Sequence, residues 1–446
     1  MGKAFERKVA DRTATVGIVG LGYVGLPLGV AFARAGFPVI GVDLSAEKVA
    51  ALTRGESYIL DVPAGHVREQ LDSGRFRATV EFDALSVADA IFVCVPTPFD
   101  RAKAPDLSFI TSAAESLVPV LRKGQLILLE STTYPGTTEE VLIPILERSG
   151  LRAGADFSVA FSPERIDPGN RTYTIANTPK VVGGIDRDST DRAALLLQQV
   201  VKEGAVHRVS TPRAAELTKL LENTFRAVNI ALVNELAVLC DRMGIDVWEV
   251  IDAAKTKPYG FMAFYPGPGV GGHCIPVDPY YLSWKAREYD FSTKFIEVAA
   301  ETNQDMPFFA VEKFRRQLGA HGRALLGARV LVLGAAFKRD IDDARNSSAI
   351  KVIEILRREG AEVRYHDPHV PMIRVADTVY GEAERNVEMR SVELTDSEIG
   401  AADAVAILVG HTAVDYAKLR AKAKLLFDAV NVLASPGSAD GRHVRL

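Results

Sequence analysis

Short apolar runs alternate with amphipathic stretches through the first half of the chain. Residues 14–20 (ATVGIVG) form a run of buried-strand type, residues 26–33 place apolar side chains at helix spacing, and residues 37–43 (FPVIGVD) form a second run that ends in an acid. Further strand-like runs follow at residues 90–98, 124–132, 158–164 and 180–184. Such alternation indicates a parallel sheet with helices on both faces, so we expect a doubly wound α/β domain over residues 1–210.

The pattern then changes to that of one long helix over residues 211–244. Thr211 is placed to cap it, Pro212 suits its first turn, and Gly244 ends it. At 1.5 Å per residue, roughly thirty residues span about 45 Å, which is enough to bridge two domains and to offer a dimer face. The central region, residues 211–322, also contains an expected helix at 246–255, a loop rich in glycine and proline at 265–279 and a helical stretch at 280–319.

A second unit of strand and glycine begins at residues 328–338 (ARVLVLGAAFK). A helix at 347–359 and strands at 361–368, 404–410 and 424–431 continue it. We therefore expect a smaller doubly wound sheet over residues 323–446. The predicted fold is α/β, with two Rossmann-like parallel-sheet domains joined by a long central helix.

Composition narrows the class of protein. Lys and Arg number 53 and Asp and Glu number 57, and this net charge of −4 argues against a nucleic-acid-binding protein, which normally carries a basic excess. No window approaches about 18 uninterrupted apolar residues, which argues against a membrane span. The N-terminal residues MGKAFERKVADRT lack the apolar core of a signal peptide, and three cysteines make no disulfide framework. We expect a cytoplasmic protein.

A glycine-rich turn joins the first strand to the first helix. Gly20, Gly22 and Gly25 make a GxGxxG motif there, and Asp43 ends the second strand, 23 positions after Gly20. The glycines allow a tight turn, the approach of a pyrophosphate and close packing of helix on strand, while an acid at this position accepts bonds from ribose hydroxyls and repels a 2′-phosphate. The motif predicts NAD rather than NADP; the alternative is a glycine turn that serves packing alone.

Cys274 lies in the loop of residues 271–279 (GGHCIPVDP). A single cysteine is most often a small buried hydrophobe, and that interpretation is assigned to Cys94 and Cys240. In a loop rich in glycine, in an enzyme that uses NAD, a thiol instead favours covalent catalysis on an aldehyde.

Three polar residues share one face of the long helix: Lys219, Asn223 and Arg226. They form either a solvated stripe or part of a site, and the residues alone leave both open. In a site, a lysine ammonium near a thiolate would lower the pKa of the thiol and stabilise an oxyanion.

Other candidates follow strands, where ligands meet such sheets. Glu164 is a candidate acid, base or water ligand, Arg165 a candidate for binding anions, and Thr97 and Thr132 end two further strands. Lys338 and Arg345 either bind phosphate or belong to a solvated charge pattern with neighbouring aspartates.

No metal site is predicted. The eight histidines show no HxxxH or similar ligand spacing, and His273 is interpreted as a loop hydrogen-bonding residue.

Taken together, seven segments resemble the UDP-glucose/GDP-mannose dehydrogenase family. They are GIVGLGYVGLP, CVPTP, LESTTYPGTTEE, SPERIDPGN, AAELTKLLENTFRAVNIALVNELA, GPGVGGHCIPVDPYYL and AFKRDIDDAR. The resemblance covers nearly the whole chain. Within the family, the N-terminal arm, SPERIDPGN and the loop before Cys274 are most similar to bacterial UDP-N-acetylglucosamine 6-dehydrogenases that supply surface-polysaccharide synthesis.

The resemblance implies oxidation of the sugar C6 hydroxyl to a carboxylate by two NAD+ and one water. Cys274 would take the C6 aldehyde as a thiohemiacetal, which hydride loss converts to a thioester. By the same resemblance Lys219 and Asn223 stabilise the oxyanion, Asp278 assists proton handling, and Glu164 and Thr132 position the hydrolytic water. The family also implies a homodimer formed through the long helix, or a higher homo-oligomer.

Binding residues are likewise implied by the family's motifs. The cofactor positions are Gly20, Gly22, Tyr23, Val24, Gly25, Asp43, Lys48, Thr97, Thr132 and Arg345. The UDP-sugar positions are Arg165, Ile166, Lys219, Asn223, Arg226, Tyr265, Gly267, Gly271, Phe337 and Lys338.

One departure concerns the last strand of the third unit, where many members carry Asp-x-Arg with the arginine reaching the substrate. Here the stretch is Asp428, Ala429, Val430, Asn431, so the arginine is absent at Val430. Either Arg226 or another basic residue then covers the phosphates, or the affinity for the substrate is weaker. UDP-N-acetylmannosamine or UDP-glucose as substrate, a two-electron hydroxyacid dehydrogenase, and an inactive nucleotide-sugar sensor remain alternatives.

Overall fold

The computed structural model describes residues 2–59, 61–99, 104–167, 169–170, 172–272, 274–377, 385–434 and 441–446. The chain divides into two compact units. The first comprises Met1–Glu222 with Tyr280–Ser292, and the second comprises Asn223–Pro279 with Thr293–Leu446. Each unit is built on its own sheet.

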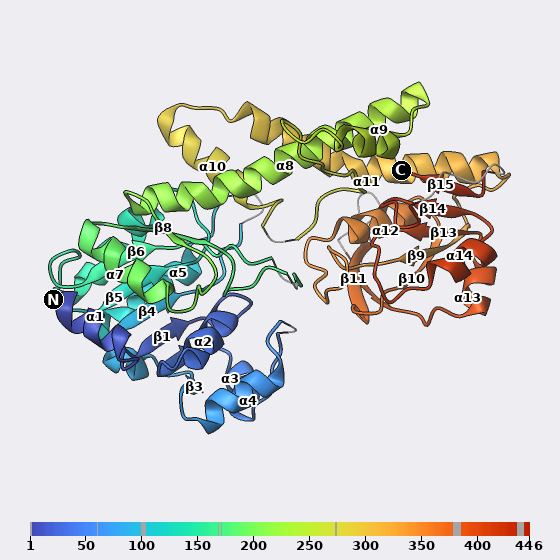
Figure 1. Ribbon diagram of the computed structural model, residues 1–446. Coiled ribbons are helices and arrows are strands. Elements are labelled where there is room, and N and C mark those ends of the chain that lie inside the picture. Colours follow the sequence, from blue (N-terminus) through green and yellow to red (C-terminus); the bar gives the residue numbers. More distant parts are fainter. Residues whose placement is uncertain are drawn as a thin grey trace. The chain divides into compact units, whose positions relative to one another are not determined.

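The first unit contains a sheet in the order β3-β2-β1-β4-β5-β6-β7-β8 (Figure 1). Its strands are β1 Val16–Val19, β2 Val39–Val42, β3 Phe76–Thr79, β4 Ala90–Val93, β5 Leu126–Leu129, β6 Ser158–Phe161, β7 Lys180–Gly184 and β8 Val206–Arg208. Strands β1 to β6 pair in parallel, with Val16 opposite both Val39 and Ala90. The order 3-2-1-4-5-6 is that of a Rossmann sheet, which confirms the doubly wound fold.

One strand departs from the expected parallel pattern. β7 runs antiparallel to β6, with Ala160 opposite Gly184, and β8 is parallel to β7. Because of this reversal, Lys180, the first residue of β7, lies at the edge of the sheet where β5 and β6 end. In a doubly wound sheet this is the edge that meets ligands.

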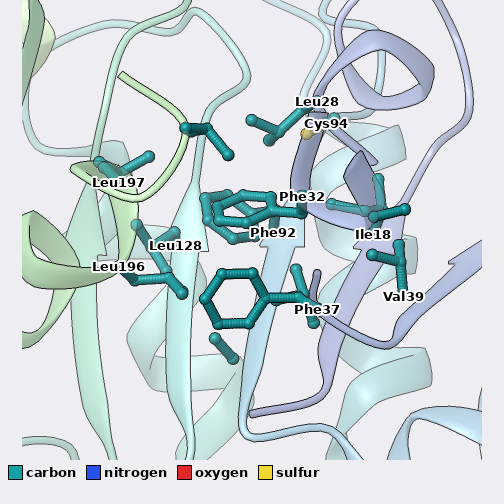
Figure 2. Close-up of a cluster of buried hydrophobic side chains, with 14 of the residues drawn as sticks. Ile18, Leu28, Phe32, Phe37, Val39, Phe92, Cys94, Leu128, Leu196 and Leu197 are labelled. Carbon is teal, nitrogen blue, oxygen red and sulfur yellow. The ribbon is translucent and has the colours of Figure 1, made fainter. Parts of the chain in front are cut away.

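Helices cover both faces of this sheet. They are α1 Gly2–Ala10, α2 Gly25–Arg34, α3 Ala46–Thr53, α4 Ala64–Asp72, α5 Ser108–Leu117, α6 Ile143–Leu146 and α7 Arg187–Leu197. Figure 2 shows the core on one face, where Phe32 of α2 packs against Phe37 and Phe92 and meets Leu196 of α7. The helices α5 and α6 bury Ile110, Leu117 and Leu146 on the other face, together with Leu142 of the turn before α6.

The long helix is confirmed as α8, Pro212–Met243, which belongs by sequence to both units. The hydroxyl of Thr211 accepts a hydrogen bond from the Ala214 N–H at 3.1 Å, as expected of a cap. Gly244 follows with a φ of 70°, a left-handed conformation that ends a helix. The next helix is α9 Val247–Ala254, capped by the side chain of Asp246.

The predicted helical stretch at 280–319 is two helices. α10 spans Asp278–Ala286, a short 3₁₀ turn follows at Arg287–Tyr289, and α11 spans Lys294–Ala320. Asp290 has a φ of 51°, so the chain turns there and the helix cannot continue. Nothing in the periodicity of apolar residues marks this break.

The second unit carries a parallel sheet in the order β10-β9-β13-β14-β15 and a separate hairpin. Its strands are β9 Arg329–Leu333, β10 Glu362–His366, β13 Ala404–Ile407, β14 Leu426–Asp428 and β15 His443–Arg445, and the hairpin pairs β11 Met372–Asp377 with β12 Arg385–Arg390. The helices α12 Ser348–Arg358, α13 Asp396–Ala401 and α14 Tyr416–Lys422 complete it. Buried side chains on both faces of β9 and β13 confirm the second doubly wound sheet.

Candidate active site

The glycine turn between β1 and α2 has two glycines fixed by packing and one that faces open space. Gly20 has a φ of 91°, and a Cβ there would lie 2.6 Å from the Cys94 carbonyl oxygen. A Cβ on Gly25 would lie 1.9 Å from the Gly20 carbonyl oxygen. Apart from its neighbours in the chain, no described atom lies within 4 Å of a Cβ built on Gly22. Packing alone therefore explains Gly20 and Gly25, whereas Gly22 leaves room for a ligand at the N-terminus of α2.

Asp43 connects the end of β2 to this turn. Its carboxylate accepts hydrogen bonds from the Leu21 and Ser45 N–H groups, both at 2.9 Å, and the Lys48 ammonium lies 3.4 Å away. Tyr23 and Val24 follow directly in the turn, and Val24 is the residue before α2. A glycine turn, a helix N-terminus and an anchored acid together fit the pyrophosphate and ribose of a dinucleotide.

Glu164, after β6, is held by three donors. Its Oε1 accepts the Arg165 and Ile166 N–H groups at 2.6 and 2.7 Å, and its Oε2 lies 3.1 Å from the Lys180 ammonium. The same ammonium lies 2.9 Å from Oε1 of Glu130, which follows β5. All three charged side chains are buried. Glu130 and Lys180 were not singled out from the sequence, since a lone charge at a strand end gives no pattern.

The two carboxyl groups beside Lys180 have opposite pKa shifts. Burial raises the pKa of Glu130 to about 7, against the attraction of Lys180. Burial also acts to raise the pKa of Glu164, but Lys180 and the backbone N–H groups outweigh it, so this pKa lies below its usual value. Near neutral pH, Glu164 is therefore a carboxylate and Glu130 holds a proton part of the time.

Glu216 anchors α8 to the loop that follows β5. Its carboxylate accepts hydrogen bonds from the Gly136 N–H at 2.6 Å and from the N–H and hydroxyl of Thr138 at 2.9 and 2.7 Å. Thr132 is half-buried in the same loop, and Lys219 is buried on α8, one turn beyond Glu216. This contact fixes the position of α8 along the loop that carries Thr132.

Two other predicted residues of the first unit form hydrogen bonds within the chain itself. The Arg165 guanidinium bonds to both oxygens of Glu222 at 2.5 and 3.3 Å and to the Pro179 carbonyl at 2.8 Å. The carbonyl of Thr97 accepts a hydrogen bond from the Tyr281 hydroxyl. Arg165 therefore faces α8 as part of an ion pair in this structure.

In the second unit, the loop before Cys274 rests on Phe337. A Cβ on Gly271 would lie 2.9 Å from the Phe337 Cβ, and one on Gly272 would lie 3.0 Å from its ring. Gly272 has a φ of 96°, and its carbonyl accepts a hydrogen bond from the Asn346 amide at 3.3 Å. Only glycine fits these positions without movement of Phe337. His273 lies outside the described residues.

Cys274 is half-buried and begins the turn that leads into α10. Its carbonyl accepts the Val277 and Asp278 N–H groups at 3.0 and 2.8 Å. The Asp278 carboxylate in turn accepts a hydrogen bond from the Asn223 amide at 2.5 Å, and both side chains are buried. These hydrogen bonds link Cys274, Asp278 and Asn223 within the second unit.

The remaining predicted residues of the second unit are Tyr265, Gly267, Arg226, Lys338 and Arg345. Tyr265 is exposed, stacks on Trp248 and bonds to Asp252, and the Gly267 N–H bonds to the Asn234 amide at 3.0 Å. Lys338 is half-buried after β9, Arg226 is exposed on α8, and Arg345 is exposed and paired with Asp343 at 2.6 Å.

Three domain models of the UDP-glucose/GDP-mannose dehydrogenase family match the chain. The NAD binding domain matches residues 14–201, the central domain residues 213–305 and the UDP binding domain residues 331–435. The chain belongs to this family. It is an NAD-dependent UDP-sugar dehydrogenase, and the UDP binding model covers Phe337, Lys338 and Arg345.

Relatives of this dehydrogenase include several with nucleotide-sugar substrates. A UDP-N-acetyl-D-glucosamine 6-dehydrogenase of Pseudomonas aeruginosa is 39% identical over 80% of this chain and 83% of its own. A UDP-N-acetyl-D-mannosamine dehydrogenase of Pyrococcus horikoshii is 37% identical over 80% of this chain and 84% of its own. A solved structure of a UDP-D-ManNAc dehydrogenase from Pyrococcus horikoshii has a TM-score of 0.86, is 32% identical and covers 97% of this chain and 98% of its own.

Val430, where the resemblance in sequence led us to expect an arginine, lies in the turn after β14. The carboxylate of Asp428 accepts N–H groups of the turn that follows it, and Asn431 accepts a hydrogen bond from the Arg445 guanidinium at 3.4 Å. Arg445 also pairs with Asp246. Arg445 is therefore a cation that contacts Asn431, the residue after Val430.

A metal site was not predicted, and within the described ranges one group of three possible ligands occurs: Asp340, His369 and His411. The His411 Nδ1 accepts the Asp340 N–H at 3.0 Å, and its Nε2 lies 3.0 Å from Asp367. Both ring nitrogens of His411 are thus used in hydrogen bonds. In the part of the chain that the structure describes, no helix is long and apolar enough to cross a membrane.

Proposed function

We propose that this dehydrogenase oxidises the C6 hydroxyl of UDP-N-acetylglucosamine to the uronic acid, in the cytoplasm, for surface-polysaccharide synthesis. The observation that carries the proposal is the grouping of Cys274 with Asp278 and Asn223. A cysteine whose carbonyl accepts the Asp278 N–H, in a segment held by the Asn223 amide, suits covalent oxidation of an aldehyde, which a two-electron dehydrogenase does not need. The Pseudomonas aeruginosa relative supports the choice of sugar.

In this proposal the Cys274 thiolate adds to the C6 aldehyde and forms a thiohemiacetal. The Lys219 ammonium and the Asn223 amide stabilise the oxyanion, and Asp278 handles the thiol proton. NAD+ supplies the hydride acceptor for both oxidation steps. Loss of the second hydride leaves a thioester on Cys274, which a water held by Glu164 and Thr132 hydrolyses to the acid.

We propose the same cofactor-binding and substrate-binding residues that the sequence motifs imply. Gly20, Gly22, Tyr23, Val24, Gly25, Asp43, Lys48, Thr97, Thr132 and Arg345 are proposed for NAD. Arg165, Ile166, Lys219, Asn223, Arg226, Tyr265, Gly267, Gly271, Phe337 and Lys338 are proposed for the UDP-sugar. Arg165 would have to exchange Glu222 for the substrate, so its role requires that ion pair to open.

We also propose a homodimer formed through α8. The helix exposes an apolar stripe at spacings of three, four and seven residues: Leu217, Leu221, Phe225, Leu232, Leu236, Leu239 and Met243. A stripe of this spacing on one helix is suited to packing against another helix. The proposed partner is a second copy of this chain.

Counting NADH against limiting UDP-N-acetylglucosamine tests the proposed reaction. Two NADH per sugar are expected from the wild-type protein, and C274S should form no acid. C240S, which alters a buried thiol outside the proposed site, should retain both NADH. One NADH per sugar, or an unchanged yield from C274S, would contradict the thioester route. Ligand binding without NADH would favour a nucleotide-sugar sensor.

UDP-N-acetylmannosamine is the second candidate substrate. It is favoured by the Pyrococcus horikoshii protein, whose fold matches this chain with a TM-score of 0.86. The values of kcat/KM for UDP-N-acetylglucosamine, UDP-N-acetylmannosamine and UDP-glucose, measured side by side, decide between them. A higher value for either of the other sugars would replace the proposed substrate and leave the proposed chemistry intact.

A further inference from the structure

Behind Glu164 lies a second carboxyl group that no step above uses. Glu130 follows β5, Glu164 follows β6, and the reversed strand β7 begins at Lys180. The antiparallel direction of β7 is what brings the Lys180 ammonium between the two carboxyl groups, at 2.9 and 3.1 Å. The three side chains form a continuous buried row at the ligand edge of the sheet.

We propose that Glu130 and Lys180 are positioning residues that act through Glu164: Glu130 stores the proton released when water attacks the thioester, and Lys180 passes that proton between the two carboxyl groups. This inference rests on the proposed function, because it assigns a path to the proton of its hydrolytic step. It makes Glu164 the residue that touches the water and Glu130 the residue that holds the proton.

The hydrogen bonds of Glu164 show why it needs a second group. Two backbone N–H groups occupy the lone pairs of its Oε1, and the Lys180 ammonium takes one lone pair of Oε2. One lone pair remains, which is enough to orient a water. A carboxylate with three donors is a weak base, because protonating it gives up hydrogen bonds that favour its charge. Glu164 can therefore direct a water but does not keep its proton.

Glu130 has the opposite surroundings. Its Oε1 contacts Lys180, while its Oε2 is buried and has no hydrogen-bond partner among the described residues. A buried carboxylate with a donor on only one of its oxygens is costly, and protonation of the group removes the charge that causes the cost. The pKa of Glu130 is raised accordingly, to about 7.

The charges that face Glu130 come from three neighbouring elements. They are Lys180 at the start of β7, Glu164 after β6 and the Cys94 thiol after β4. Burial and the nearby carboxylates raise the pKa of Cys94, so this thiol stays neutral. Two carboxylates with one ammonium leave one negative charge in a buried cluster. Uptake of one proton makes the cluster neutral, and Glu130 is the member able to take it.

The proposed step conserves atoms and charge. As the water oxygen bonds to the thioester carbon, one O–H bond breaks and its proton goes to Oε2 of Glu164. In one concerted motion, Lys180 gives an N–H proton to Oε1 of Glu130 and takes the proton from Glu164, so it never becomes a neutral amine. Lys180 remains an ammonium, Glu164 returns to a carboxylate, and Glu130 becomes neutral. The C–S bond then breaks and leaves the acid and the Cys274 thiolate.

E130Q tests the proposal because glutamine keeps the shape and cannot accept the proton. With UDP-N-acetylglucosamine and NAD+, E130Q should give a rapid burst of two NADH per site and then a turnover reduced roughly ten- to a hundredfold. Intact-protein mass spectrometry should detect the acyl group that accumulates on Cys274. The wild-type rate should rise with pH through about 7, where Glu130 loses its proton, and E130Q should lack this rise. KM for sugar and for NAD+ should stay within about twofold.

Two further variants separate the proton path from simple damage. K180R keeps the positive charge beside both carboxyl groups, but a guanidinium does not give up its proton, so it should show the same burst and slow hydrolysis. D89N removes a different buried carboxylate, at the opposite end of β4, and should hydrolyse the thioester like the wild type. If E130Q does not fold, E130D keeps an acid at a shifted position and should retain the rise at a shifted pH.

If the NADH time course and the pH profile of E130Q are the same as those of the wild type, the proposal is overturned while the proposed function stands. Absence of NADH from all three UDP-sugars would instead overturn the proposed function. In that case infrared titration still decides the protonation of Glu130: a protonated carboxyl band that titrates near neutral pH should be present in wild type and D89N and absent in E130Q. Persistence of that band in E130Q contradicts the assignment to Glu130.

Discussion

The side-chain amide of Asn223 donates a hydrogen bond of 2.5 Å to the carboxylate of Asp278. Asn223 lies on α8, and Asp278 begins α10, four residues after Cys274. The Asp278 N–H also bonds to the Cys274 carbonyl at 2.8 Å, so hydrogen bonds link Asn223 through Asp278 to Cys274. The Asn223 side chain of α8 thus holds the start of α10 in place.

N223A should therefore affect catalysis more than binding. We expect kcat to fall roughly 10²-fold or more, as when one oxyanion donor is removed, with a smaller change in KM. N229A is the matched control, because Asn229 lies on the same helix, is half-buried and bonds only to a backbone carbonyl of its own helix. Initial rates at several sugar concentrations measure the split. An effect confined to KM would place Asn223 in substrate binding alone.

Two glycines of the NAD turn should respond differently to alanine. G25A brings a methyl group against the Gly20 carbonyl and should lower stability by about 1–3 kcal/mol. G22A meets no described atom, so its melting temperature should match the wild type while its Kd for NAD rises at least about tenfold. Thermal melts and fluorescence titration with NAD check both. Equal NAD affinity in G22A and wild type would mean that no pyrophosphate passes this glycine.

D43N should weaken the preference for NAD over NADP. The carboxylate that repels a 2′-phosphate is lost, and we expect the ratio of kcat/KM for the two cofactors to move about tenfold toward NADP. S45A provides the control, because it removes only the cap of α3 next to Asp43. An unchanged ratio in D43N would remove Asp43 from the ribose site.

The apolar stripe of α8 should hold the dimer. L236E places a charge within the stripe and should shift the protein from dimer to monomer in sedimentation velocity. L326E changes a more exposed leucine outside α8 and should leave the dimer intact. A wild-type protein that sediments as a monomer would refute the proposed interface outright.

Acid should destabilise the second unit through Asp367. Burial acts to raise the pKa of this carboxyl, but His411 and the N–H groups of Ala335, Ala336 and His369 outweigh it, and the pKa lies well below the usual value. Because the folded pKa is depressed, its stabilising effect is present above the unfolded value near 4 and is lost as the pH falls below it. We expect D367N to lower stability at pH 7 by about 3 kcal/mol and to flatten the loss in acid.

Urea unfolding of the full chain from pH 7 to pH 3 measures this effect. D396N is the control, since Asp396 is exposed and paired with lysines at the surface, and it should change stability by less than about 0.5 kcal/mol. A D367N protein as stable as D396N at pH 7 would show that His411 and the turn do not depend on this carboxylate.

Much of the fold could be predicted because local signals agree with it. Thr211 and Gly244 mark the ends of α8 in sequence and in structure, and the glycine turn and Asp43 occupy the expected strand ends. The direction of β7 could not be predicted, since a run such as KVVGG pairs equally well either way. The helix α1 was also missed, because its stability comes from tertiary packing of Phe5 and Val9 in the core.

The residues of the site likewise divide into those that the sequence indicates and those that it does not. Cys274, Asp278 and Asn223 belong to motifs with recognisable spacing, and the structure groups them. Glu130 and Lys180 lie 50 residues apart, on strands whose relative direction is invisible in the sequence. The ion pair between Glu130 and Lys180 depends on how the strands assemble, so no pattern in the sequence predicts it.

The contact between Gly272 and Phe337 limits how this chain can evolve. A side chain at position 272 would need both a tolerance for a φ of 96° and a space now filled by the aromatic ring. Neither change helps without the other, so any substitution at Gly272 must pass through an intermediate with a displaced cysteine loop. Sequence drift at these two positions should therefore be coupled, and a descendant that lost the ring would be the first in which position 272 is free to vary.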